Sequence, residues 1–211
     1  MQRCVIVGGA EIRNYAFVRK QLRPDDYVIF CDSGLTHMER LGVSPALIVG
    51  DFDSHANPKL PVETIVLPCE KDDTDTVFAV KEALNRGFDT FLLAGVVGGR
   101  LDHTLANVSI LVMLQEQGKR GSIVDDYSIM EMISNKPVLI EDDCRFFSLL
   151  NITGMAEEIS ISNAKYLLKD AKIGCSYQYG TSNEVLPGQT SKIVVGKGQL
   201  LLIRVFRDSE K

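Results

Sequence analysis

The sequence predicts an α/β domain followed by a small all-β domain. In the first 125 residues, short runs of Val, Ile, Leu and Phe alternate with longer stretches of helical periodicity. The runs are continuously apolar, which is typical of parallel strands covered on both faces. After about residue 130, strand-like runs separated by Gly, Asn and Pro turns replace the helical pattern. We therefore expect a mostly parallel sheet flanked by helices over residues 1–130 and an antiparallel β-sandwich over residues 131–211.

The expected elements follow from these patterns in chain order. The strands of the first domain are expected at 4–7, 27–31, 46–49, 64–67, 90–94 and 122–125. Helices are expected where apolar residues recur at three- and four-residue spacing, over 12–22, 35–42, 74–87 and 101–118. Strands of the second domain are expected within 138–143, 145–152, 157–163 and 191–206.

Composition argues against a nucleic-acid-binding, membrane or disulfide-bonded protein. The chain of 211 residues has 23 basic and 28 acidic side chains, a net charge of −5, and no Lys/Arg-rich run, so nucleic acid is not an expected partner. No signal peptide and no run of about 20 apolar residues occurs, so we expect a cytoplasmic protein without a membrane segment. The five cysteines form no C-x-x-C pair and are expected to be reduced core residues.

Glycine or aspartate follows most strands of the first domain. Ligands of an open parallel sheet bind beyond the carboxyl ends of its strands, so these loops are expected to meet at one edge. The loops are Gly8-Gly9, Asp32-Ser33-Gly34, Gly50-Asp51-Phe52-Asp53-Ser54 and Gly98-Gly99-Arg100-Leu101-Asp102-His103. Taken alone, Gly8-Gly9 fits both a tight turn and a close approach of a nucleotide to the backbone.

The loop after the third strand carries two aspartates. In an extended backbone, side chains two residues apart point the same way, so Asp51 and Asp53 can hold one hard cation between them. The alternative is an Asx-turn at the end of the strand.

The segment KDDTDT at 71–76 opens a predicted helix. Asp and Thr are favoured N-caps, and acidic groups in a first turn are stabilised by the helix dipole. However, three aspartates are more than one cap requires, and massed carboxylates repel unless a cation joins them. Asp72 and Asp75 share a helix face. Capping and metal binding both remain open.

The segment GGRLDH at 98–103 joins a glycine loop to an arginine at a helix start. Backbone N–H groups and the guanidinium of Arg100 suit a phosphate. The alternative is a capped helix with a solvated Arg100 and a polar His103. His37 and His55 have no partner pattern, and we expect them at the surface.

Taken in order, five segments resemble thiamine pyrophosphokinases over nearly the whole chain. The segments are Asp32-Ser33-Gly34, GDFDS (50–54), KDDTDT (71–76), GGRLDH (98–103) and Gly180-Thr181-Ser182-Asn183-Glu184. The resemblance implies transfer of the pyrophosphoryl group of ATP to the hydroxyl of thiamine, giving thiamine diphosphate and AMP, with Mg²⁺. It also implies a homodimer whose active site lies between the α/β domain of one subunit and the β-domain of the other.

The motifs and the resemblance together assign the expected site residues. Catalytic and metal-binding roles are expected for Asp51, Asp53, Asp75 and Asp102. ATP or phosphate binding is expected for Gly8, Gly9, Asp32, Ser33, Gly34, Lys71, Asp72, Thr74, Gly98, Gly99, Arg100 and His103. Thiamine binding is expected for Ser182, Asn183 and Tyr179.

Two questions stay open at this point. Asp75 and Asp102 are both candidates for accepting the proton of the thiamine hydroxyl. The chain has no tryptophan, on which some relatives stack the thiamine pyrimidine. Either Tyr177 or Tyr179 substitutes for it, or the ring meets aliphatic groups only.

Two rival functions share these loops. One is an ATP-dependent transferase acting on a different alcohol, which only the second domain would distinguish. The other is a regulatory module that binds nucleotide or metal without turnover; in that case replacing Asp51 or Asp102 would leave no activity to lose.

Overall fold

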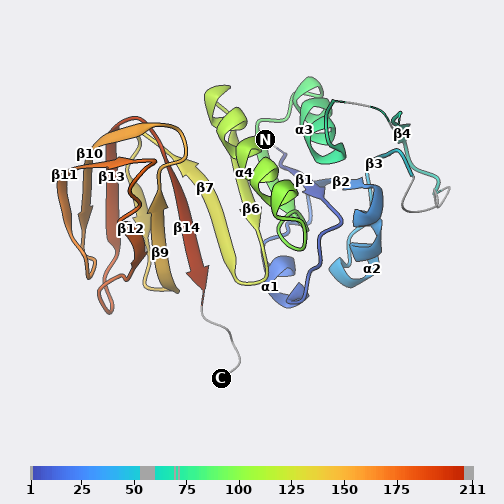
Figure 1. Cartoon of the computed structure of the whole chain (residues 1–211). Coiled ribbons are helices and arrows are strands. Elements are labelled where there is room, and N and C mark those ends of the chain that lie inside the picture. The colour runs from blue at the N-terminus through green and yellow to red at the C-terminus, as the bar shows by residue number, and fades with distance from the viewer. Residues whose placement is uncertain (1, 53–59, 69, 71, 207–211) are drawn as a thin grey trace. The chain divides into compact units, whose positions relative to one another are not determined.

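A computed structural model describes residues 2–52, 60–68, 70 and 72–206 of the chain (Figure 1). The chain divides into two compact units, residues 1–126 and 127–211. Strands and helices alternate in the first unit, whereas the described part of the second contains strands only. This is the fold class predicted from the sequence, an α/β unit followed by an antiparallel β unit.

The first unit is built on a parallel sheet. Its strands lie in the order β6-β5-β1-β2-β3-β4, and each neighbouring pair is parallel. The strands are β1 (Cys4–Val7), β2 (Tyr27–Cys31), β3 (Leu47–Gly50), β4 (Thr64–Val66), β5 (Thr90–Ala94) and β6 (Arg120–Val124). Each begins and ends within about two residues of a run expected from the sequence.

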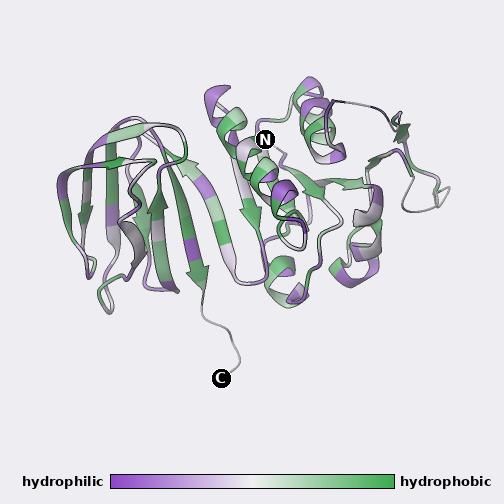
Figure 2. Cartoon of the chain, in the orientation of Figure 1, coloured by the Kyte–Doolittle hydropathy of each residue, from purple (hydrophilic) through white to green (hydrophobic). Residues whose placement is uncertain are grey.

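Helices cover both faces of this sheet. They are α1 (Tyr15–Lys20), the 3₁₀ helix η1 (Asp32–His37), α2 (Met38–Leu41), α3 (Asp75–Asn85) and α4 (Leu101–Glu116). Figure 1 shows α3 and α4 on one side of the sheet and α1 and α2 on the other, the arrangement that right-handed crossovers produce. Because both faces are covered, the strands β1, β2, β3 and β5 are almost wholly buried, whereas the edge strand β4 has no buried residue. Figure 2 shows that these inner strands are mostly apolar.

The direction of winding reverses at β1. This strand has β2 on one side and β5 on the other, so the chain builds the sheet outward from β1 both ways. The loops that leave the carboxyl ends of β1 and β5 therefore diverge toward opposite faces. Ligands of open α/β sheets bind in the crevice that such a reversal leaves.

The second unit consists of antiparallel strands in two groups, β12-β9-β14-β7 and β11-β10-β13-β8. The strands are β7 (Ser128–Ile133), β8 (Val138–Ile140), β9 (Cys144–Leu150), β10 (Met155–Ser162), β11 (Leu168–Gly174), β12 (Gly180–Asn183), β13 (Ser191–Lys197) and β14 (Leu200–Phe206). Alternate residues, among them Phe147, Ile159, Ile193 and Leu202, point inward and form one apolar core.

Three details differ from the expectations. Residues 191–206 form two strands, because Gly198 turns the chain with a φ of 77°. Strand β11 was not expected, since polar Lys and Asp residues interrupt its apolar residues and only Ile173 is fully buried. Cys175 is exposed, whereas Cys4, Cys31 and Cys144 are buried as expected, and Cys69 lies outside the described residues. Within the described ranges, no helix combines the length and the apolar character needed to cross a membrane.

Candidate active site

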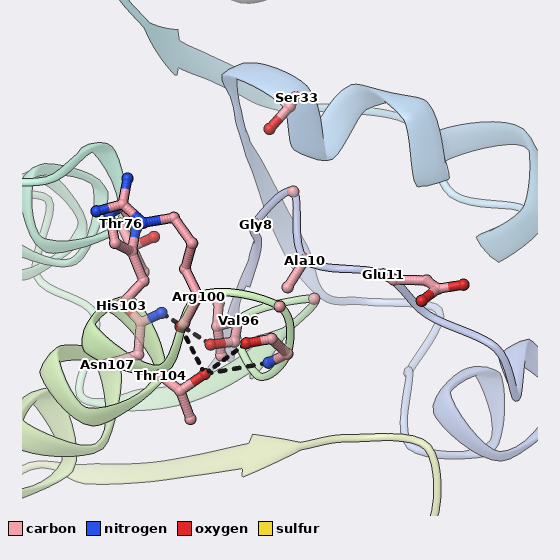
Figure 3. A pocket seen from close by; sticks show the side chains of 14 residues that line it. Gly8, Ala10, Glu11, Ser33, Thr76, Val96, Arg100, His103, Thr104 and Asn107 are labelled. Atoms are coloured by element: carbon pink, nitrogen blue, oxygen red, sulfur yellow. Dashed lines mark hydrogen bonds between the residues drawn. The ribbon is translucent and has the colours of Figure 1, made fainter.

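A cavity of about 510 Å³ opens in the first unit at the reversal of the sheet (Figure 3). Its walls come from the loops after β1 and β5, the starts of η1 and α3, and the first two turns of α4. The lining residues are Gly8, Gly9, Ala10, Glu11, Ser33, Thr76, Gly95, Val96, Gly98, Gly99, Arg100, His103, Thr104 and Asn107. This volume is in the range of sites for small molecules and cofactors.

The loops that form the cavity touch through glycines. A Cβ on Gly8 would lie 2.7 Å from the carbonyl oxygen of Gly95, so a side chain there would push the two loops apart. A Cβ on Gly34 would overlap the Val7 carbonyl at the end of β1. These glycines shape the cavity by allowing backbones to approach each other closely.

Two side chains of α4 fix the loop that precedes it. The Thr104 hydroxyl accepts the Gly98 N–H (3.1 Å) and lies within donor reach of the carbonyl oxygens of Gly98 (3.1 Å) and Arg100 (3.2 Å). One turn further on, the Asn107 Nδ2 donates to the Val96 carbonyl (2.9 Å). Figure 3 shows these contacts gathered on one side of the cavity. The glycine loop is therefore held in a fixed shape.

Arg100 and Asp102 form an exposed ion pair at the cavity rim. The Nη2–Oδ2 distance is 2.6 Å and the Nε–Oδ1 distance is 3.2 Å, so the contact has two points. The hydrogen bond from Arg100 lowers the pKa of Asp102 to about 2. Asp102 is therefore ionised at any working pH, and it occupies the guanidinium that an incoming phosphate would bind.

Three carboxylates gather at the carboxyl ends of β2 and β3. One oxygen from each of Asp32, Asp51 and Asp75 lies within 4.8 Å of the others, and Asp32 is only 7 % exposed. The Cys31 thiol donates to the Asp75 carbonyl (3.7 Å), which ties the start of α3 to the end of β2. Three acidic oxygen donors at this spacing form a candidate site for a hard divalent cation.

The pairing of neighbouring strands brings Asp32 and Asp51 together. Cys31 of β2 pairs with Val49 of β3, so the residues that follow the two strands lie side by side. The approach depends on Gly50, where a Cβ would lie 2.9 Å from the Cβ of Asp32.

At the start of α3, the residue that caps the helix differs from the residue that joins the acidic cluster. Thr74 is the N-cap, and its hydroxyl accepts the Val77 N–H (3.3 Å). Asp73 pairs with Lys81 at 2.6 Å. Asp75 is left as the residue of this segment that joins the cluster. Capping is therefore confirmed for Thr74, and metal binding stays a prediction for Asp75.

The cavity collects seven of the residues expected to bind ATP or phosphate. They are Gly8, Gly9, Ser33, Gly98, Gly99, Arg100 and His103. Gly34 packs behind the wall, Thr74 caps α3, and Asp72 is exposed and does not line the cavity. Lys71 lies outside the described residues.

The expected metal ligands are only partly brought together. Asp51 and Asp75 share the acidic cluster with Asp32, which the sequence had placed at the nucleotide. Asp102 does not belong to that cluster among the described residues, and its carboxylate pairs with Arg100 instead. Asp53 lies outside the described residues.

Several cavity residues were not anticipated. Thr104 and Asn107 follow His103 on the same helix. Asn107 is buried, and an Asn among the apolar positions of a predicted helix could have indicated a buried polar contact. The expectation that His37 lies at the surface was wrong, because it is buried between two hydrogen-bond partners from other segments. His55 lies outside the described residues.

In the second unit, neighbouring residues of the expected thiamine segment have different environments. Ser182 is exposed with a φ of 54°, and its N–H donates to the Ser148 hydroxyl (3.0 Å). Asn183 is 4 % exposed. Its Oδ1 accepts the N–H groups of Tyr166 and Glu184 (both 2.9 Å), and its Nδ2 donates to the Tyr166 carbonyl (2.7 Å). Asn183 therefore holds the backbone, and the Ser182 hydroxyl is the accessible group.

Two tyrosines lie just ahead of this segment. The rings of Tyr177 and Tyr179 are 5.4 Å apart and are 72 % and 40 % exposed. The Tyr179 hydroxyl donates to the Lys172 carbonyl (2.5 Å), which leaves its ring as the group available to a ligand.

Two family models match the chain in succession. Residues 18–122 match "Thiamin pyrophosphokinase, catalytic domain", and residues 138–200 match "Thiamin pyrophosphokinase, vitamin B1 binding domain". The first match falls within the unit that carries the cavity and the second within the β unit.

Relatives and solved structures agree with these matches. The chain is 27 % identical over 181 residues to thiamine pyrophosphokinase of Bacillus subtilis, covering 82 % of this chain and 84 % of the relative. The fold is shared with the crystal structure of thiamine pyrophosphokinase from Bacillus subtilis, with TM-score 0.84, 24 % identity and coverage of 98 % and 100 %. Thiamin pyrophosphokinase from Geobacillus thermodenitrificans gives TM-score 0.81, 25 % identity and 99 % coverage of both chains. The chain belongs to the thiamine pyrophosphokinase family, whose reaction is the transfer of a pyrophosphoryl group from ATP to thiamine.

Proposed function

We propose that the cavity of the first unit binds ATP and that the acidic cluster holds Mg²⁺ during pyrophosphoryl transfer to thiamine. The observation that carries this proposal is the meeting of the predicted phosphate-binding loops in one cavity at the reversal of the sheet. The carboxylates of the cluster lie at the ends of β2 and β3 in the same unit.

Arg100 is the proposed phosphate ligand. Its side chain lines the cavity, and its two-point contact with Asp102 has the geometry that a phosphate would use. Binding of ATP exchanges one anion for another at this guanidinium. Gly99 beside it has no side chain, so a phosphate can approach the backbone there, whereas the Gly98 N–H is already bound to the Thr104 hydroxyl.

Asp32, Asp51 and Asp75 are the proposed Mg²⁺ ligands. One oxygen from each lies within 4.8 Å of the others, so these three carboxylates would hold a hard divalent cation between them. When bound, Mg²⁺ neutralises charge on the triphosphate and on the departing AMP. Asp53 is proposed as a further ligand on the family resemblance alone, because Phe52 has a φ of 56° and interrupts the extended backbone that the i, i+2 argument requires.

The proposed chemistry needs no covalent enzyme intermediate. The thiamine hydroxyl oxygen forms a bond to the β-phosphorus of ATP while the bond from that phosphorus to the oxygen of AMP breaks. The hydroxyl proton passes to a carboxylate, for which Asp75 and Asp102 are the two candidates. Pairing with Arg100 lowers the pKa of Asp102 to about 2 and makes it a weak base, so Asp102 would accept this proton only after a phosphate displaces it from Arg100.

The thiamine side is proposed to lie in the β unit. Ser182 offers an exposed hydroxyl, and the exposed rings of Tyr177 and Tyr179 can face the cationic thiazolium. Asn183 is proposed to act on thiamine through the backbone that it holds.

A homodimer with the active site between the first unit of one subunit and the second unit of the other is part of the proposal. Leu101 and Leu105, one turn apart on α4, are 69 % and 59 % exposed, an apolar surface that a second chain would cover. A cytoplasmic location is also proposed, because four described cysteines are free and ATP is a cytoplasmic substrate.

An assay of AMP release with Mg²⁺ tests the proposal. Asp51→Asn should lower thiamine-dependent AMP release a hundredfold or more, on the order of 3 kcal/mol of transition-state stabilisation. Asp73→Asn is the matched control, because Asp73 pairs with Lys81 outside the cluster and its loss should leave activity near wild type. Equal activity of the two variants would contradict the assignment of Asp51 as a metal ligand. Release of AMP that does not depend on thiamine would contradict thiamine as the substrate.

A further inference from the structure

We propose that His37 is a positioning residue for ATP binding, holding the Gly8–Glu11 loop against the cavity through the carbonyl of Ala10. The inference rests on the proposed function, because it takes the cavity beside this loop to be the ATP site. His37 itself does not line that cavity.

His37 bridges two segments inside the first unit. It ends η1, is 6 % exposed, and has its Nδ1 2.6 Å from the Tyr15 hydroxyl and its Nε2 3.0 Å from the Ala10 carbonyl oxygen. Because a carbonyl oxygen can only accept, Nε2 must carry the hydrogen. The neutral ring then accepts the Tyr15 O–H at Nδ1, so both ring nitrogens are used in one tautomer.

The Ala10 carbonyl is one of several points at which the loop is held. The Gly8 N–H donates to the Ala94 carbonyl (2.9 Å), and the Ala10 N–H donates to the Gly95 carbonyl (2.8 Å). Both contacts tie the loop to the end of β5. The bond from His37 ties the loop to η1 by a side-chain hydrogen bond, in addition to the close packing of Gly9 on Ser33.

The far end of the same segment is fixed separately. The Asp126 carboxylate accepts the N–H groups of Arg13 (2.8 Å) and Asn14 (2.9 Å), and Asn14 caps α1 by accepting the Phe17 N–H (3.1 Å). With both ends anchored and the Ala10 N–H still bound to Gly95, loss of the His37 bond would loosen the loop on the side of Ala10 that faces η1. This loop lines the cavity.

The surroundings of His37 favour its neutral form. Burial lowers its pKa, and the Arg40 guanidinium lowers it further, whereas the hydrogen bond to Ala10 raises it. Three groups face the ring: the Tyr15 hydroxyl from α1, Arg40 from α2, and the Ala10 carbonyl from the loop. Arg40 also covers the Tyr15 ring at 3.8 Å, which closes this side from water.

Substituting His37 by Gln or by Asn distinguishes its hydrogen bond to Ala10 from its hydrogen bond to Tyr15. His37→Gln places an amide N–H near the position of Nε2 and can still donate to Ala10, whereas His37→Asn reaches only the position of Nδ1 beside Tyr15. We expect the Kd of Mg·ATP, measured by calorimetry without thiamine, to stay within about twofold for Gln and to rise about five- to tenfold for Asn. The KM of thiamine should not change in either variant.

A destabilised variant elsewhere in the unit serves as the control. Arg3 is partly buried and donates to the Asp26 carboxylate (2.7 Å) and the Gln21 carbonyl (2.6 Å), and it does not line the cavity. Arg3→Leu should lower Tm and leave the Kd of Mg·ATP unchanged.

Three results would overturn the inference: equal Kd values for the Gln and Asn variants, a matching loss of affinity in Arg3→Leu, or a parallel rise in the KM of thiamine. If the wild-type chain itself does not bind Mg·ATP, the proposed function fails first, and the inference falls with it. Loss of affinity in His37→Asn alone supports the inference.

Discussion

The guanidinium of Arg100 contacts the carboxylate of Asp102 at two points, with distances of 2.6 Å and 3.2 Å. Two-point pairing is also how a guanidinium binds a phosphate, so Asp102 would compete with the phosphate that we propose Arg100 binds. The side chains are 69 % and 65 % exposed, which makes the exchange with a phosphate easy.

The first prediction concerns this competition. Asp102→Asn should tighten binding of ATP about two- to fivefold, because it removes the resident anion and exposed ion pairs contribute at most about 1 kcal/mol. Arg100→Lys should weaken ATP binding about tenfold, since an ammonium cannot bind two oxygens of one phosphate in the same plane. Calorimetry at low and high salt measures both. Weaker binding in Asp102→Asn would show that Asp102 contacts the metal–nucleotide complex itself.

The second prediction concerns the metal. Addition of Mg²⁺ should raise Tm in the wild type, and Asp51→Asn or Asp75→Asn should abolish most of that rise, because each removes one of three charged ligands. Chelation should stop activity, and added Mg²⁺ should restore it. Differential scanning fluorimetry with Asp73→Asn as the control checks this. An unchanged Mg²⁺ response in both cluster variants would contradict the site.

Much of the first unit was predictable, and the composition of the acidic cluster was not. Short apolar runs and helical periodicity locate β1 to β6 and the helices, because local patterns determine local structure. Grouping Asp32 with Asp51 depends on β2 lying next to β3 with Cys31 opposite Val49, which is a tertiary fact. The roles of His37 and Asn183 depend on backbone groups distant in the sequence, so neither has a local signal.

The third prediction concerns the close approach of the two strand ends. Gly50→Ala places a Cβ 2.9 Å from the Cβ of Asp32, so the strand ends must move apart. We expect a loss of about 1–3 kcal/mol of unfolding free energy and a weaker response to Mg²⁺. Gly99→Ala is the stability control, because a Cβ there meets no atom within 4 Å. Denaturant titration compares the two, and equal stability would contradict the role of Gly50.

The fourth prediction separates the two residues of the thiamine segment. Asn183→Asp replaces the Nδ2 donor with an oxygen facing the Tyr166 carbonyl, so unfolding free energy should fall by about 1–3 kcal/mol. Ser182→Ala should leave stability unchanged and raise the KM of thiamine, since its hydroxyl is exposed. Denaturant titration and steady-state kinetics measure the two effects. A stable Asn183→Asp with only a raised KM would mean that Asn183 contacts thiamine directly.

The fifth prediction is a pH effect on stability. Burial lowers the pKa of His37 below the ordinary 6.5, so in the window below 6.5 the unfolded chain binds a proton that the folded chain does not. The contribution of His37 to stability is therefore present above pH 6.5 and is lost as the pH falls toward the folded pKa. The unfolding free energy of the wild type should fall more steeply between pH 7 and pH 5.5 than that of His37→Gln, when both are measured by denaturant titration. Parallel curves would contradict a buried neutral His37.

The central claim is pyrophosphoryl transfer from ATP to thiamine, and the fate of the phosphorus atoms tests it most directly. With ATP labelled at the β-phosphorus, we expect the label in thiamine diphosphate. With ATP labelled at the α-phosphorus, we expect it in AMP. Both products should form in equal amounts and only with thiamine and Mg²⁺ present. Release of labelled ADP, or label in AMP without thiamine diphosphate, would contradict it.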